Sequence, residues 1–350
     1  MATSGTYEFQ SPQVEQIITD AYERVGIIRD LLTPQKGQAA QRSLNFILSC
    51  WPNRGLNLWT VKKEMMTLYP GQATYNLPLG TSDILEATVR TSTRNLDGEA
   101  FASSGDADNA FDGDPDTACT QGAPNGNIGY TWDDTQFSIA LVGIQSNATL
   151  TYTLVFEFSN DDATWTQVLA AAAQTYTEST IVWFEIPVPT AGSYFRVRET
   201  GGATLNIQEL YFNTSMNDFI MTPWSRSEWM SQLNKSQQGK PTQYWVDRSL
   251  TPTVTLWDVP DSNYNCLFYT RIQMPEDIGS LTNSPEVPSR FLEALTSELA
   301  AKLAIKEGKL DRTELLYSLA DREFKLASKE DTERVPIRFY GNYSYGSISV

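Results

Sequence analysis

The charges of this 350-residue chain are distributed unevenly, and this constrains its fold more than any other feature of the sequence. Residues 91–215 contain 16 acidic residues, three arginines and no lysine, whereas the remaining 225 residues carry 26 acids and 23 bases. Two segments of such different charge composition within one chain indicate an inserted domain. Insertion is tolerated where the chain leaves and re-enters its host at neighbouring points of a loop.

The absence of histidine excludes several kinds of chemistry. Ser-His-Asp and Cys-His catalysis and histidine-ligated zinc are removed. A glycosidase with two carboxylates needs no histidine, but the chain lacks GxSxG, P-loop and HExxH motifs, so we expect no enzyme. Three widely spaced cysteines predict reduced thiols and assembly in a cytoplasm. Neither a membrane-spanning run nor an N-terminal secretory signal is expected.

The segments on either side of 91–215 show helical periodicity. Apolar residues at spacings of three and four predict one helix after Ser11 and Pro12, a second that stops at Pro52, and two more near the C-terminus. In the first of the C-terminal pair, Glu298 and Lys302 have the spacing of a surface ion pair. Asp311 with Glu314 resembles a capping box that opens the last helix.

Shorter β-type runs accompany these helices. Residues 65–69 and 73–77 flank a Pro-Gly turn and predict a hairpin, and residues 84–90 predict a further strand. The predicted fold class is therefore α+β. A helical-bundle body with small β-hairpins, formed by residues 1–90 and 216–334, would carry an all-β domain over residues 91–215.

The middle segment has the spacing of a β-sandwich, since turn residues separate about seven short strand-like runs. These runs are 128–132, 137–145, 151–159, 164–169, 181–186, 194–199 and 206–212.

Three motifs in this segment resemble those of discoidin-type jelly rolls, the family of coagulation-factor C-domains and many carbohydrate-binding modules. They are the loop NAFDGDPDT at 109–117, the hairpin FEFSNDDATW at 156–165, and the strands YFRVR at 194–198 and IQEL at 207–210. The resemblance covers about residues 93–213. It implies a jelly-roll sandwich.

The same resemblance implies a structural Ca²⁺ in the acidic loop, because calcium takes six to eight carboxylate and carbonyl oxygens. An Asp-rich turn without an ion is the alternative. An EF-hand is excluded, because the required glycine and closing glutamate are missing. The ligands carried over from the family are Asn109, Asp112, Asp114, Thr117, Gln208 and Glu209.

Glycan binding by the family uses aromatic residues that stack on the sugar. Trp132, Trp165 and Trp183 are available, but their strand-like settings favour core positions. The family usually has tryptophan after the loop threonine, whereas this chain has Ala118 and Cys119, so it departs from the family's standard packing and usual binding surface at this point.

The flanking segments resemble the head-to-tail adaptor proteins of short-tailed bacteriophages. The resemblance rests on an ordered set that is collinear once 91–215 is removed, and it covers most of 10–90 and 216–330. The set includes RSLN at 42–45, NRGLNLW at 53–59, YPGQATYNLP at 69–78, SRSEW at 225–229, GKPTQYWVDR at 239–248 and LWDVPD at 256–261.

This resemblance implies a virion protein at the head–tail interface, assembled in the host cytoplasm. Its partners would be further copies in a ring, twelve-fold in relatives, then the portal protein, the tail nozzle or tube, and DNA that passes without sequence recognition. Such a ring extends the DNA channel and retains the packaged genome. Each subunit needs two different surfaces for the ring to close.

Two further hypotheses concern what the chain contacts. The last residues, 335–350, are rich in aromatic side chains and predict an arm that docks onto another subunit, with a solvated tail as the alternative.

The alternative to the adaptor function is a glycan-binding decoration or adhesin that acts through the inserted sandwich. Host glycans, other virion proteins and no ligand at all stay open for that domain.

Overall fold

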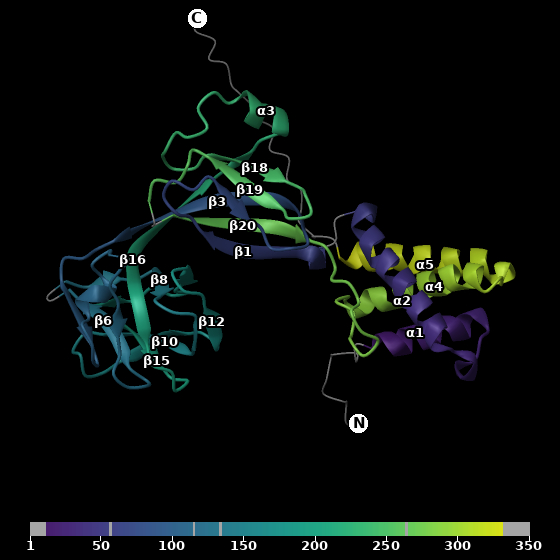
Figure 1. The fold of residues 1–350 in the computed structure, drawn as a ribbon, viewed down its shortest axis with the longest axis horizontal. Helices are drawn as coiled ribbons and strands as arrows, with labels where there is room; N and C mark the ends of the chain where they lie inside the picture. Colours follow the sequence, from purple (N-terminus) through teal and green to yellow (C-terminus); the bar gives the residue numbers. More distant parts are fainter. Residues whose placement is uncertain (1–11, 56–57, 115, 133–134, 263–264, 332–350) are drawn as a thin grey trace, which may run out of the picture. The chain divides into compact units, whose positions relative to one another are not determined.

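The computed structural model describes residues 12–55, 58–114, 116–132, 135–262 and 265–331; the predicted arm at 335–350 lies outside them. The chain divides into two compact units (Figure 1), residues 1–62 with 272–350 and residues 63–271. The division does not fall at residues 90 and 216, because strands on both sides of the insert share a sheet with strands inside it.

The first unit is helical, as the periodicity predicted. Its helices share one apolar core that includes Leu44, Trp51, Phe291 and Leu299. Gly26, at φ 90°, ends the first helix in the left-handed conformation that glycine adopts without strain. These helices are α1 (Val14–Val25), α2 (Pro34–Cys50), α4 (Ser289–Lys306) and α5 (Leu310–Glu330).

The predicted capping box of the last helix is wrong. Helix α5 begins at Leu310, with Lys309 in the capping position and no side-chain hydrogen bond to the helix end. Asp311 therefore lies inside the first turn, where its negative charge faces the positive end of the helix dipole. The start of α5 is fixed by its packing on α4, because only three residues connect the two helices.

The second unit contains a seven-stranded sheet in the order β1-β20-β3-β16-β8-β13, with β5 also on β16. The strands are β1 (Val61–Thr67), β20 (Asn265–Gln273), β3 (Thr81–Arg94), β16 (Asn206–Ile220), β8 (Leu141–Ser146), β13 (Ile181–Glu185) and β5 (Cys119–Thr120). A smaller sheet follows the order β17-β18-β19-β2. It consists of β17 (Thr222–Pro223), β18 (Gln243–Asp247), β19 (Thr253–Trp257) and β2 (Thr74–Asn76), and the short helix α3 (Arg226–Ser231) follows β17.

The hairpin predicted over residues 65–77 is wrong, and the flanking body is not limited to small hairpins. Strands β1 and β2 diverge after the turn at Gly71 and join different sheets, β1 beside β20 and β2 beside β19. Both partners come from the sequence after the insert, so local spacing could not show them. Tyr75 secures the divergence, since its hydroxyl accepts from the Tyr69 amide at 2.9 Å and also lies 3.1 Å from the Tyr69 carbonyl.

The predicted β-sandwich is present. A five-stranded sheet in the order β11-β10-β15-β6-β4 faces the β16-β8-β13 part of the larger sheet across one apolar core, which includes Phe156, Phe195, Ile144 and Phe212. The sheet comprises β11 (Thr166–Ala170), β10 (Leu154–Ser159), β15 (Tyr194–Glu199), β6 (Asn127–Thr131) and β4 (Glu99–Ala102). Two-stranded pairs complete it, namely β9 (Leu150–Tyr152) with β12 (Gln174–Tyr176) and β7 (Phe137–Ser138) with β14 (Ala191–Gly192).

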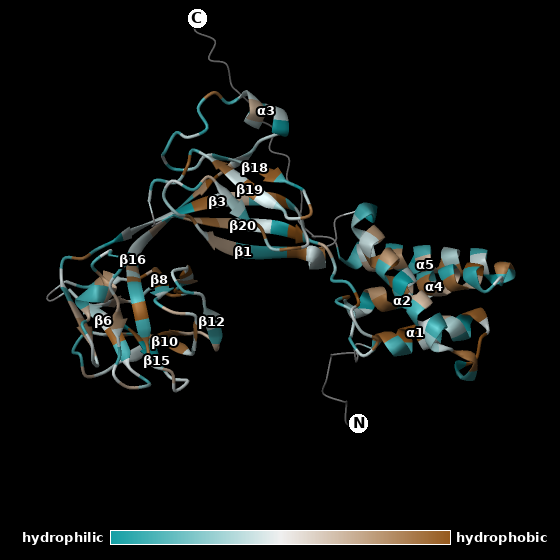
Figure 2. Ribbon diagram, viewed as in Figure 1, coloured by the Kyte–Doolittle hydropathy of each residue, from teal (hydrophilic) through white to brown (hydrophobic). Residues whose placement is uncertain are grey.

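One long strand joins the sandwich to the remaining strands of its unit. Residues 207–213 of β16 pair with β8, and residues 213–220 pair with β3, so the partner changes at Asn213. Apolar and polar segments alternate along β16 in Figure 2. The outgoing and returning chain thus lie side by side as antiparallel neighbours, which is the geometry an insertion requires.

The two edge strands of the larger sheet also meet. The Thr67 hydroxyl at the end of β1 donates to the Ile181 carbonyl of β13 at 2.7 Å, and the Ile181 amide donates to the Tyr69 hydroxyl at 3.1 Å. Apolar residues of the insert, such as Trp183, and of the flanking sequence, such as Cys266, share a small core there. The sandwich is therefore held at a second point besides β16.

Candidate functional site: the acidic loop and aromatic surface of the sandwich

The acidic loop follows a short 3-10 turn at Asp108–Ala110. The Asp112 carboxylate accepts a hydrogen bond from the Asp114 amide at 2.9 Å and from the Thr117 hydroxyl at 2.8 Å. That hydroxyl also lies 3.0 Å from the Asp114 carbonyl. Partial burial would raise the pKa of Asp112, but these hydrogen bonds prevail and lower it.

Glu209, from β16, lies behind this loop with 2% of its surface exposed. One carboxylate oxygen accepts from the Gly113 amide at 2.5 Å, and the other lies 3.1 Å from the Arg94 guanidinium. Burial raises the pKa of Glu209 to about 7 against the opposing effect of Arg94, and the neighbouring Asp112 carboxylate raises it further.

Arg94 is the functional candidate that sequence reasoning missed. Its side chain is 4% exposed, donates to the Leu210 carbonyl at 2.6 Å, and lies 4.6 Å from the centre of the Tyr211 ring. The one available signal was its rarity, because residues 91–215 contain only two other arginines. Arg94 supplies part of the positive charge that Glu209 needs.

Four of the six predicted calcium ligands converge, namely Asp112, Asp114, Thr117 and Glu209. The other two lie beside them in sequence, with the Asn109 side chain bonded to the Ala118 carbonyl at 3.3 Å and Gln208 buried before Glu209. Within the described residues, no three His, Cys, Asp or Glu side chains form a metal-binding group. Two adjacent carboxylates with a hydroxyl and a carbonyl oxygen are nevertheless donors of the kind that calcium takes, so the chemistry fits.

An aromatic surface covers the outer face of the five-stranded sheet. It consists of Phe101 on β4, Trp165 before β11 and Tyr194 on β15, with ring centres 6.1–6.5 Å apart. All three rings are half-buried, and none belongs to the sandwich core. The Arg196 guanidinium lies 3.8 Å from the centre of the Trp165 ring. Gly129 makes room for this arrangement, since a Cβ there would lie 2.3 Å from Phe101 Cζ.

The placement of Trp165 corrects the expectation that all three sandwich tryptophans are core residues. Trp132 and Trp183 are buried, as expected, but Trp165 lies at the surface. The turn before it explains this position. The Asp161 carboxylate accepts from the amides of Ala163 at 3.0 Å and Thr164 at 2.7 Å, which lowers the pKa of Asp161 to about 2.

Comparisons with known proteins find matches among solved structures. No protein-family model matches the chain, and no curated protein matches it. Solved structures that resemble part of it include carbohydrate-binding modules, each similar to about a third of this chain. A family 32 module from Clostridium perfringens NanJ, solved with galactose, is 15% identical, covers 35% of this chain and 96% of its own, and has a TM-score of 0.28.

Two further structures match a similar share of this chain and of their own length. Chitosan-binding module 1 from a chitosanase/glucanase of Paenibacillus sp. IK-5 is 21% identical over 33% of this chain and 94% of its own, with a TM-score of 0.29. CBM32-3 from a family 31 glycoside hydrolase of Clostridium perfringens is 18% identical over 36% and 96%, with a TM-score of 0.30. No helix among the described residues is long and apolar enough to cross a membrane.

Proposed function

We propose that the inserted sandwich binds glycans and that its ligand surface is the aromatic surface of Phe101, Trp165 and Tyr194. The observation that carries this proposal is the grouping of three half-buried rings outside the core. Rings in this position offer apolar faces to the C–H face of a sugar. Beside them, the partly exposed Arg198 guanidinium can donate hydrogen bonds to hydroxyl groups.

A glycan array probed with the full chain tests this function. Replacing Trp165 by alanine should weaken binding to any positive glycan at least tenfold, which corresponds to about 1.4 kcal/mol. Leu150→Ala removes an exposed apolar residue elsewhere on the sandwich and should leave binding unchanged. An array on which the chain recognises no glycan would count against the proposal.

We also propose that the acidic loop holds a structural Ca²⁺ through the six predicted ligands. The bound ion would balance the adjacent Asp112 and Glu209 carboxylates and fix the loop. At a free calcium concentration 100 times the Kd, such an ion stabilises the fold by about 2.7 kcal/mol. A calcium chelator should therefore lower the melting temperature of the chain but not that of Asp112→Ala. Equal melting of the unaltered chain with and without chelator would contradict the ion site.

For the rest of the chain we propose the adaptor role, in a non-catalytic virion ring between portal and tail nozzle that lets DNA pass and retains the genome. The ordered motifs in both flanks support it. Exposed apolar residues in the helical unit also support it, because a ring subunit must cover such residues with a neighbour. These are Ile305, Leu310, Leu315 and Leu326, with 49–70% of their surfaces exposed.

Electron microscopy of the purified chain mixed with portal rings tests the adaptor role. We expect a collar stacked on the portal, and Leu315→Asp should reduce the fraction of portals that carry one. Leu79→Asp, which alters an exposed leucine in the other unit, is the control. A chain that stays monomeric and has no affinity for portal rings would rule out this role.

A further inference from the structure

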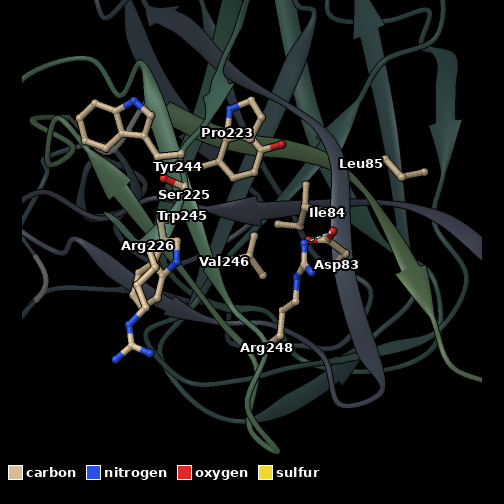
Figure 3. Close-up of a pocket in the computed structure, with 11 residues that line it drawn as sticks. Asp83, Ile84, Leu85, Pro223, Ser225, Arg226, Tyr244, Trp245, Val246 and Arg248 are labelled. Carbon is tan, nitrogen blue, oxygen red and sulfur yellow. Dashed lines mark hydrogen bonds and ion pairs between the residues drawn. The ribbon is translucent and has the colours of Figure 1, made fainter. Parts of the chain in front are cut away.

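A cavity of about 450 Å³ lies in the second unit outside the sandwich. It is lined by β3, β18 and the segment that leads into α3 (Figure 3). Ile84 and Val246 form apolar parts of its lining, and Trp224 and Trp245 add aromatic rings. The volume falls within the range of about 300–1,000 Å³ that small-molecule sites occupy.

The two tryptophans of this cavity are held in place by other indoles. Trp224 stacks on Trp257 with ring centres 5.3 Å apart and 26° between the planes. Trp245 stacks on Trp229 at 6.2 Å and 10°, and Lys235 Nζ lies 5.4 Å from the Trp229 ring. Because each ring has a stacked partner, the cavity presents pre-positioned flat apolar surfaces to a ligand.

Polar groups lie in the same lining. Arg248 donates to the Asp83 carboxylate at 2.5 Å (Figure 3), and both side chains keep contact with solvent. Tyr244 is 2% exposed, and among the described residues its hydroxyl has no hydrogen-bond partner. An unused hydroxyl inside a protein is uncommon, because an unmet hydrogen bond costs about 1–3 kcal/mol.

We propose that this cavity binds a single pyranose ring of a glycan. A pyranose has apolar C–H faces that match the indoles and hydroxyl edges that match an ion pair, since Asp83 accepts hydrogen bonds and Arg248 donates them. Arg226, an exposed residue of the same lining, can donate hydrogen bonds to a further hydroxyl group. An aliphatic ligand would displace water from the ion pair, and it could not replace the hydrogen bonds that this water makes.

This site is separate from the aromatic surface of the sandwich, and the proposal stands whether or not that surface binds glycans. Titration of the full chain with the methyl glycosides of glucose, galactose, mannose and N-acetylglucosamine, followed by saturation-transfer NMR, tests it. At least one should bind. Asp83→Asn should weaken the affinity for that glycoside tenfold or more. It should barely change the melting temperature, because exposed ion pairs contribute little to the stability of the fold.

Three variants make the test specific. Asp247→Asn removes the same charge from the end of β18, outside the cavity lining, and should leave the affinity unchanged. Tyr244→Phe should weaken binding several-fold without loss of stability, because the hydroxyl makes no hydrogen bond to any residue that the structure describes. Trp165→Ala disables the sandwich surface and should not affect this site.

Outcomes that overturn the proposal are equally distinct. Binding that survives Asp83→Asn but disappears in Trp165→Ala belongs to the sandwich and refutes the cavity site. Lack of binding by all four glycosides at millimolar concentration also refutes it. Binding that Asp83→Asn weakens and Trp165→Ala preserves supports the cavity site even where the sandwich fails on the array.

Discussion

Glu157 shows how a single residue organises the surface on which the sandwich function depends. It lies on β10 with 7% of its side chain exposed and contacts Arg196 and Arg198 of the neighbouring strand at 2.7 and 2.6 Å. Burial would raise the pKa of Glu157, but the hydrogen bonds and charges of both guanidinium groups lower it. Glu157 thereby holds Arg196 against Trp165.

Replacing Glu157 by glutamine should destabilise the second unit. We expect the free energy of unfolding, measured by urea titration, to fall by about 2–3 kcal/mol. This is less than the loss of about 3–5 kcal/mol that is typical when a buried ion pair is broken, because Arg198 reaches solvent. The folded pKa lies below the unfolded value of about 4.3, so this stabilisation is complete above that pH and disappears as the pH falls through the folded pKa. The unaltered chain should thus lose more stability than Glu157→Gln between pH 6 and pH 3, and equal losses would contradict this assignment.

At the scale of elements, α4 is the central helix of its unit. It packs against α1, α2 and α5, so even its charged residue Glu298 is 4% exposed. The predicted surface pair of Glu298 with Lys302 is replaced by a buried site, in which Glu298 accepts from Trp51 Nε1 at 3.0 Å and from Arg54 at 2.7 Å. One carboxylate thus joins α4 to the end of α2.

Glu298→Ala should lower the free energy of unfolding of the helical unit by about 2–4 kcal/mol, because it leaves a buried indole N–H and a guanidinium without an acceptor. Circular dichroism during urea titration measures this, since the helices dominate the signal. Glu314→Ala, an exposed change on α5, should cost less than about 0.5 kcal/mol. Similar midpoints for the two variants would show that the buried site adds no stability.

For the whole molecule, the main feature is the way the insert leaves and rejoins its host. Because β3 and β16 pair from Arg94 with Asn213 to Thr88 with Ile220, a short turn can connect residues 94 and 213. Under the adaptor proposal, a chain without residues 95–212 should still form the collar on portal rings and should bind no glycan on the array. Loss of the collar together with the sandwich would assign assembly to the insert.

The sequence by itself determined the local features of this protein. Periodicity predicted the four helices, and alternation and turns predicted the sandwich, because each of these signals lies within a few neighbouring residues. The resemblance to discoidin-type jelly rolls named Asp112, Thr117 and Glu209, which the structure brings together.

Only the tertiary structure decided which distant residues meet. It placed β1 and β2 in different sheets, Arg94 beside Glu209, Trp165 at the surface and Glu298 in a core. The partners of most of these residues lie about 100 to 250 positions away in the sequence. For the others, the position of a second sheet decides which side of the strand is buried. Burial and long-range pairing are properties of the packed chain, so no local pattern records them.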